Sequence, residues 1–127
     1  MKYKSENLEV YLKTISNQYK NYLPTDIMPY KVLNEQHPSR PLFDMWETSI
    51  ANGEGWVGIV IQDQTDSDIT IKGQYTTYIH QGEYSKLGQT YQQIMIDYPQ
   101  ASEFYNVYLN DPQITESQDC LTKIVFR

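Results

Sequence analysis

The sequence is short of the residues on which metal sites and disulfide frameworks depend. Its single cysteine, Cys120, can form no internal disulfide. The two histidines, His37 and His80, lie far apart, and neither has a cysteine or second histidine at metal-ligand spacing. No phosphate-binding glycine loop and no serine nucleophile elbow is present. We therefore expect no metal, no cofactor and no catalytic residue.

Basic residues are also scarce. Ten Lys and Arg residues stand against sixteen Asp and Glu, which gives a net charge of -6. Direct binding of nucleic acid needs clustered positive charge, so we do not expect it. An acidic surface suits a cationic ligand or a basic partner protein, and it also keeps a chain soluble.

Long apolar runs are missing as well. No stretch approaches the ~20 apolar residues that cross a bilayer. The basic start, Met1 to Lys4, is followed by polar residues and not by the apolar core of a secretory leader. We therefore expect a cytoplasmic protein with no membrane contact, and 127 residues fit a single domain.

Tyrosine is abundant, with 12 residues against 3 Phe and 2 Trp. Tyrosine rings suit ligand pockets and interfaces, and they also suit half-buried strands. Near the N-terminus, apolar residues at helical spacing predict an amphipathic helix over 5–22, between a Ser5 cap and Pro24. We assign residues 1–23 to this helix, which is a candidate surface for a partner protein or a second copy of the chain.

The rest of the chain, 24–127, alternates strand and helix patterns. A helix carrying Trp46 and Ile50 is expected to begin at Ser39, and a second helix is expected over 83–97. Strands are predicted over 27–34, 56–61, 69–79, 103–109 and 121–126, with a bend at Gly73. Two halves of similar order predict an α+β fold: duplicated β-α-β-β units form one antiparallel sheet with helices on one face, plus the N-terminal helix.

Three segments of the second half resemble GyrI-like effector-binding domains, which belong to the SOUL superfamily. Gly73 to Tyr84 follows the pattern "GxYxxxxHxGxY", residues 104–112 resemble "FExYxxDP", and residues 121–126 resemble "LxTEIY". The resemblance implies a small-molecule cleft between two units and a structural hydrogen bond for His80. Two residues depart from the pattern, because the family's glutamates are Asn106 and Lys123 here.

The ligand-binding candidates combine aromatic rings with a few polar groups, as small-molecule sites do. Asn106 and Tyr108 share one strand face by alternation, and Glu47 is the candidate to replace the missing family carboxylate. The full set is Trp46, Glu47, Tyr75, Tyr78, Asn106 and Tyr108.

Three functions fit these observations. The first is a binding module for apolar or aromatic compounds, cationic ones included, that acts as a sensor or scavenger or as the effector-binding part of a transcription regulation system. The second is a protein-interaction module, such as an inhibitor of the gyrase-inhibitory type, which the net charge and the N-terminal helix suggest. The third is a small hydrolase, which would need a carboxylate in the cleft.

Overall fold

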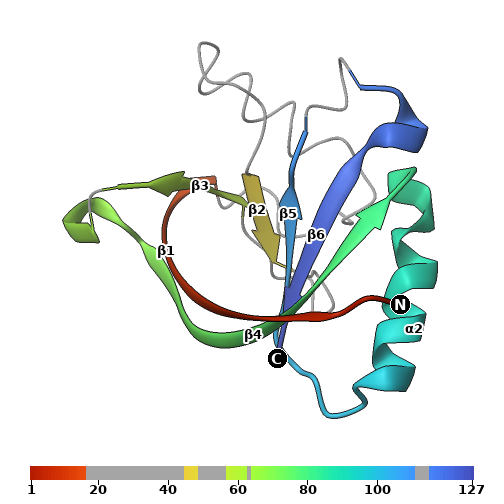
Figure 1. The fold of residues 1–127 in the computed structure, drawn as a ribbon. Helices are drawn as coiled ribbons and strands as arrows, with labels where there is room; N and C mark the ends of the chain where they lie inside the picture. The colour runs from red at the N-terminus through yellow and green to blue at the C-terminus, as the bar shows by residue number, and fades with distance from the viewer. Residues whose placement is uncertain (17–44, 49–56, 63, 111–114) are drawn as a thin grey trace.

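The computed structural model describes residues 1–16, 45–48, 57–62, 64–110 and 115–127 (Figure 1). The strands in this part of the chain are β1 (Lys4–Ser16), β2 (Met45–Thr48), β3 (Val57–Ile61), β4 (Ile69–Gln81), β5 (Phe104–Tyr108) and β6 (Leu121–Phe126). Helix α2 (Leu87–Asp97) and the 3-10 turns η2 (Gln64–Asp66), η3 (Tyr84–Lys86) and η4 (Ser117–Asp119) accompany them. Among these residues, no helix has the length and apolar character needed to traverse a bilayer.

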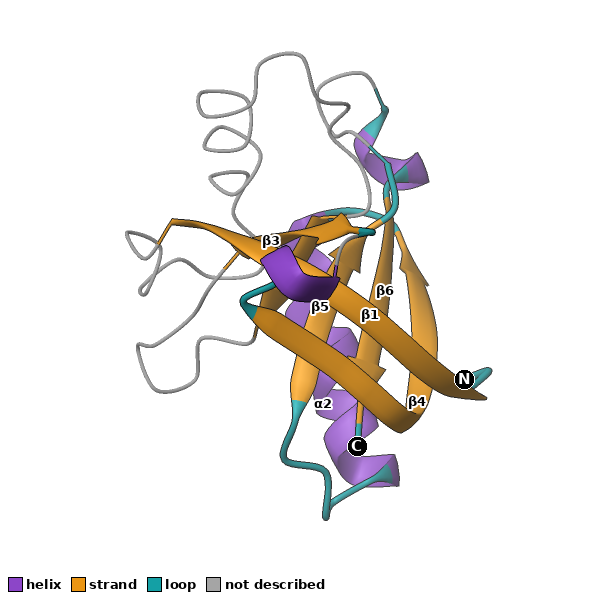
Figure 2. Cartoon of the chain, turned by 90° about the vertical axis from the view of Figure 1, so that its left-hand side faces the viewer, coloured by secondary structure: helices purple, strands orange, loops and turns teal. Residues whose placement is uncertain are grey.

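The strands form a closed antiparallel barrel (Figure 2). They pair in the order β1-β3-β2-β5-β6-β4, and β4 pairs back with β1 over Lys4–Thr77 to Leu12–Ile69. Closure pairs both edges of each of these strands, which removes the open edges that promote aggregation. The pairing scheme is unchanged when β1, β2 and β3 are exchanged for β4, β5 and β6, so β2 lies beside β5 at its centre.

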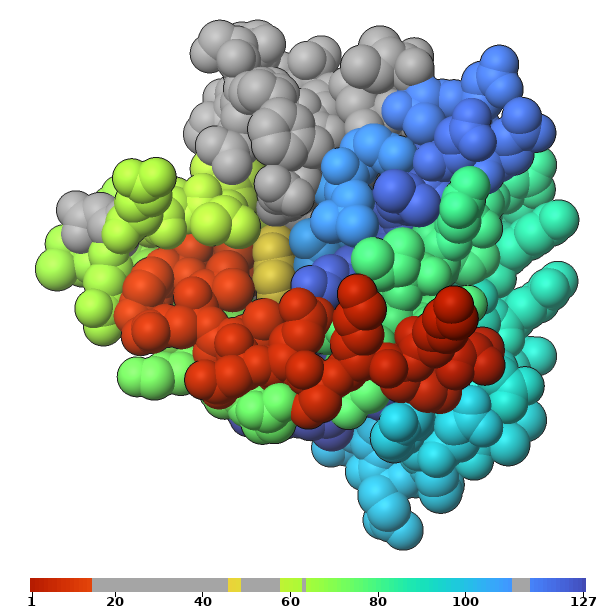
Figure 3. All heavy atoms as spheres, viewed as in Figure 1, coloured from red at the N-terminus to blue at the C-terminus, as the bar shows by residue number. Residues whose placement is uncertain are grey.

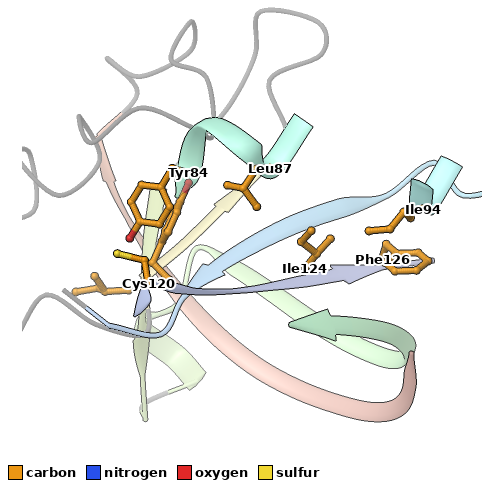
Figure 4. Packing of buried hydrophobic residues seen from close by; sticks show 8 residues of the cluster. Tyr84, Leu87, Ile94, Cys120, Ile124 and Phe126 are labelled. Atoms are coloured by element: carbon orange, nitrogen blue, oxygen red, sulfur yellow. The ribbon is translucent and has the colours of Figure 1, made fainter. Parts of the chain in front are cut away.

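Helix α2 covers part of the outside of the barrel wall (Figure 1). Its buried residues Leu87 and Ile94 belong to one cluster with Ile124 and Phe126 of β6 (Figure 4). Side chains alternate along a strand, so Val125, between them, faces the barrel interior. We call the packing on the α2 side the outer cluster. The inner cluster contains Leu12, Trp46, Ile71, Tyr75, Val107 and Val125.

The predicted N-terminal helix is wrong where the chain is described, because Lys4–Ser16 form strand β1. Leu8 and Leu12 fit one face of a helix and equally one face of a strand. Val10 decides between the two, since all three pack against the inner cluster in period-two alternation. The helical surface proposed for a partner or a second copy is therefore absent over residues 4–16, and residues 17–23 lie outside the described residues.

The predicted α+β sheet, with helices on one face of duplicated β-α-β-β units, is also wrong. β1 pairs with both β3 and β4, and this pairing closes the sheet into a barrel. The helix predicted from Ser39 to Ile50 is contradicted at Met45–Thr48, which form β2 between β3 and β5. Its other residues, and the strand predicted over 27–34, lie outside the described part of the chain.

The second half follows the predicted order of elements. The strand predicted over 69–79 is β4, and Gly73, where a bend was expected, has a φ of +127°. The helix predicted over 83–97 begins as η3 and continues as α2. The strands predicted over 103–109 and 121–126 are β5 and β6. These elements carry the segments that resemble GyrI-like domains.

Candidate functional site

A buried polar cluster lies on the outer face of the barrel, where β2 and β5 pair beside α2. It consists of Glu47, Tyr91, Asn106 and Tyr108, and we call it the Glu47 cluster. Glu47 and Asn106 are direct partners in the register of β2 and β5, so their side chains stand next to each other on one face. Tyr108 follows two residues later on that face, and Tyr91 reaches the cluster from α2.

Two phenols bind the polar groups of this cluster. Tyr108 Oη donates a hydrogen bond to Glu47 Oε1 at 2.8 Å, and Tyr91 Oη donates one to Asn106 Oδ1. Glu47 is 1% exposed, and Asn106 and Tyr108 are fully buried. Burying a carboxylate is costly unless hydrogen bonds and charges compensate it. The hydroxyl of Tyr108 supplies part of that compensation, so the cluster holds an acidic group that ordinary packing would not require.

Burial raises the pKa of Tyr91 well above the usual value of a phenol, and the negative charge of Glu47 raises it further. The hydrogen bond with Asn106 opposes this rise only in part. Tyr91 is therefore a neutral donor at physiological pH, and it lies within the field of the Glu47 carboxylate.

Asn106 also carries a donor with no acceptor. Its amide nitrogen Nδ2 is buried, and no residue in the described part of the chain hydrogen-bonds to it. Thr122 Oγ1 on β6, the register partner of Tyr108, is in the same situation. A buried polar group left without a partner costs about 1–3 kcal/mol. The outer wall thus buries a carboxylate beside polar atoms that have no hydrogen-bond partner among the described residues.

The remaining predicted ligand-binding residues lie elsewhere. Trp46 and Tyr75 belong to the inner cluster and contact Tyr105, with ring centroids 5.8 and 6.3 Å from its own. Tyr78 packs on the outer face against Tyr3, at a centroid distance of 5.8 Å. The barrel wall therefore separates Trp46 and Tyr75 from Tyr108, and the six predicted residues do not converge on one hollow.

Tyr75 takes part in a structural network at the C-terminal end of β6. Its hydroxyl donates to Glu103 Oε2 at 2.8 Å, and the Arg127 guanidinium lies 4.3 Å from its ring centroid. Burial, followed by the hydrogen bond with Glu103, raises the pKa of Tyr75 to about 12. Arg127 Nε donates to the same carboxylate at 3.0 Å, so the network joins β4, the residue before β5 and the chain end.

His80 is held in a structural role, as its position in the resembling segment implied. Its Nε2 lies 3.1 Å from the Glu83 carbonyl oxygen, which can only accept, so Nε2 carries the proton. Nδ1 forms a hydrogen bond with Thr90 Oγ1 at 2.8 Å. Within the described residues, no group of three His, Cys, Asp or Glu side chains is placed to hold a metal ion.

Sequence reasoning missed Tyr91 as a site residue. Its spacing with Leu87 and Ile94 marks the apolar face of α2 and gives no sign that its hydroxyl reaches a buried amide on β5. The pairing of Glu47 with Asn106 was equally invisible, because the register between distant strands has no local signal.

No family model and no curated protein matches the chain. Two solved structures from Listeria innocua are similar to it. One is described as a hydrolase, with a TM-score of 0.56 and 13% identity over 98% of this chain and 90% of that one. The other, an uncharacterized conserved protein, has a TM-score of 0.57 and 10% identity over 99% and 91% of the two chains. At this identity the likeness extends to the fold alone.

Proposed function

We propose that this chain is a small-molecule-binding domain of the GyrI-like kind, whose ligand contacts the Glu47 cluster. It acts in the cytoplasm as a sensor or scavenger, or as the effector-binding part of a transcription regulation system. One observation carries the proposal: a buried carboxylate stands beside Asn106, whose amide donor is buried without a partner among the described residues. An unsatisfied buried donor calls for an explanation, and a ligand with an acceptor atom that pairs with it, beside the group that meets the carboxylate, is one.

The cluster favours a cationic ligand with an apolar body. In GyrI-like domains the residue at the position of Asn106 is a glutamate that pairs with cationic ligands. Here that carboxylate is supplied by Glu47, the register partner of Asn106 on the neighbouring strand. A buried carboxylate attracts a cation far more strongly than an amide does, and tyrosine ring faces add to that attraction.

Dye binding tests this proposal. The fluorescence of crystal violet, a cationic dye, and of Nile red, a neutral dye, is titrated with wild-type protein and with Glu47→Gln. Loss of the carboxylate is expected to weaken crystal violet binding about tenfold or more, while Nile red binding changes little. Glu116→Gln is the matched control, because it removes the same charge from an exposed position. Equal binding of crystal violet by Glu47→Gln and wild type would overturn the proposal, as would no binding of either dye.

A hydrolase is the second candidate, and two observations favour it. One of the two structures of similar fold is described as a hydrolase. The Glu47 cluster also contains a carboxylate and phenols, which can activate water and donate protons. Turnover of a panel of activated esters that disappears in Glu47→Gln would support hydrolysis. No turnover above background would leave the binding function alone. The third function, a protein-interaction module, now rests on the net charge, because residues 4–16 form β1 and not the helix that also suggested it.

A further inference from the structure

A hollow of about 530 Å³ lies at one end of the barrel, away from the Glu47 cluster. Its lining includes Lys4 and Thr77, which are register partners on β1 and β4. Thr77 is also the partner of Val125, which belongs to the inner cluster. Partners on neighbouring strands share a face, so these side chains point into the barrel. In Figure 3 the first residues of the chain, in dark red, lie beside the green of β4 at this mouth.

Positive charge is concentrated in this hollow, although the chain as a whole is acidic. Lys2, Lys4 and Lys123 line it, against the single carboxylate of Glu6. Lys123 Nζ lies 2.9 Å from Glu6 Oε2, and Thr77 Oγ1 donates to the same oxygen at 2.6 Å. The Thr77 bond, together with Lys123, lowers the pKa of Glu6, so this carboxylate is ionised and neutralises one lysine.

The positive charges of Lys2 and Lys4 therefore remain at the mouth. Within the described part of the chain, no carboxylate lies within 4.0 Å of the amines of Lys2 and Lys4. Walls of low dielectric focus the field of such charges onto a concave site. The hollow therefore attracts an anion, whose negative charge can pair with these lysines.

The hollow also has an apolar side. Met1 and Ile79 are 52% and 46% exposed, and both line it. Ile79 is the register partner of Lys123, so an apolar side chain and an ammonium group stand next to each other on the inner wall. Exposed apolar side chains gathered in a concave site mark a surface that binds an apolar group.

We propose that the barrel mouth is a second ligand site, which binds a small amphipathic carboxylate. The carboxylate group pairs with Lys4 and shares Lys123 with Glu6, while the apolar body lies against Met1 and Ile79. A volume of about 530 Å³ falls within the range of small-molecule sites, roughly 300–1,000 Å³. The site is independent of the Glu47 cluster, because none of the four residues of that cluster lines the hollow.

Octanoate is the probe, titrated calorimetrically at low salt, with octan-1-ol as the uncharged comparison. Lys4→Gln and Lys123→Gln are each expected to weaken octanoate binding about threefold to tenfold. Glu6→Gln is expected to strengthen it by a similar factor, because it frees Lys123 from its internal partner. Added salt should weaken binding, and octan-1-ol should bind less tightly than octanoate.

Lys86→Gln is the control, since it removes one positive charge at an exposed position in η3 that does not line the hollow. If it weakens octanoate binding as much as Lys4→Gln does, net charge and not the mouth is responsible, and the proposal is overturned. No octanoate binding at millimolar concentration also overturns it. Lys4 lies at the start of β1, so its variant carries the test if Lys123→Gln does not fold. Glu47→Gln should leave octanoate binding unchanged, which separates this site from the proposed function.

Discussion

Replacing Tyr108 by Phe tests the Glu47 cluster at its most buried point. The variant keeps the ring, which packs against Tyr84 at a centroid distance of 5.3 Å, and removes only the hydroxyl that donates to Glu47. Hydrogen bonds to charged groups contribute about 1.5–3 kcal/mol to folding. Since both residues are buried, water cannot replace the lost donor, and we expect a loss of about 2 kcal/mol in the free energy of unfolding.

Urea denaturation followed by circular dichroism measures this loss. With a slope of about 1.5 kcal/mol/M, a loss of about 2 kcal/mol lowers the midpoint by roughly 1.3 M. Tyr78→Phe is the matched control, because Tyr78 is half-buried on the same outer face, and its hydroxyl makes no hydrogen bond in the described part of the chain. It is expected to change stability by less than about 0.5 kcal/mol.

A double-mutant cycle makes the test specific to the pair. In a Glu47→Gln background the hydroxyl of Tyr108 donates to a neutral amide instead of a carboxylate. Tyr108→Phe should therefore lower the free energy of unfolding by only about 1 kcal/mol in that background. The difference, about 1 kcal/mol, is the coupling between hydroxyl and carboxylate. Equal costs in the two backgrounds, or a Tyr108→Phe protein as stable as the Tyr78→Phe control, would refute the reasoning.

Three further predictions concern the barrel itself. Leu12→Ala empties a fully buried inner position and should lower the free energy of unfolding by about 2–5 kcal/mol, as measured in urea. Gly73→Ala should lower the free energy of unfolding by about 1–3 kcal/mol in the same assay, because a φ of +127° strains a residue that has a side chain. The new Cβ would also lie 2.7 Å from Arg127 Nη1, so the arginine side chain would have to move. Thr77→Val removes the donor that lowers the pKa of Glu6, so NMR titration of that carboxyl should show a higher value. A carboxyl whose pKa is lowered in the folded state stabilises the fold at pH values above its unfolded pKa. This stabilisation is lost as the pH falls through the folded pKa. The loss of unfolding free energy caused by Thr77→Val should therefore be larger at pH 7 than in acid.

The elements of the second half could be predicted because their signals are local. Gly82 and Pro99 bracket the helical pattern that becomes η3 and α2, and Gly73 has the positive φ that its place inside a strand pattern suggested. The N-terminal strand could not be predicted in the same way. Leu8 and Leu12 satisfy both periods, and the pairing of β1 with β4, from 57 residues away at Leu12–Ile69 to 73 at Lys4–Thr77, decides between them.

The candidate site could be predicted only in part, because only part of it depends on local signals. Alternation along β5 was enough to put Asn106 and Tyr108 on one face. It could not show that Trp46 and Glu47, as neighbours on a strand and not on a helix, would point to opposite sides of a barrel wall. Because Trp46 and Glu47 were predicted to lie on a helix, both were assigned to one site, whereas the strand places them on opposite faces.

The symmetry of the strand pairing links the fold to the proposed function. Exchanging the first three strands for the last three maps β2 onto β5, and these strands pair with each other. Glu47 and Asn106 therefore occupy facing positions at the centre of the barrel's internal symmetry. Because the two positions are register partners on one face, a carboxylate on either strand would lie at nearly the same place on the outer wall, and in this chain it is Glu47 that provides it. The sequence of β5 by itself contains no acid at this place, and only the register of β2 with β5 shows that a carboxylate stands there.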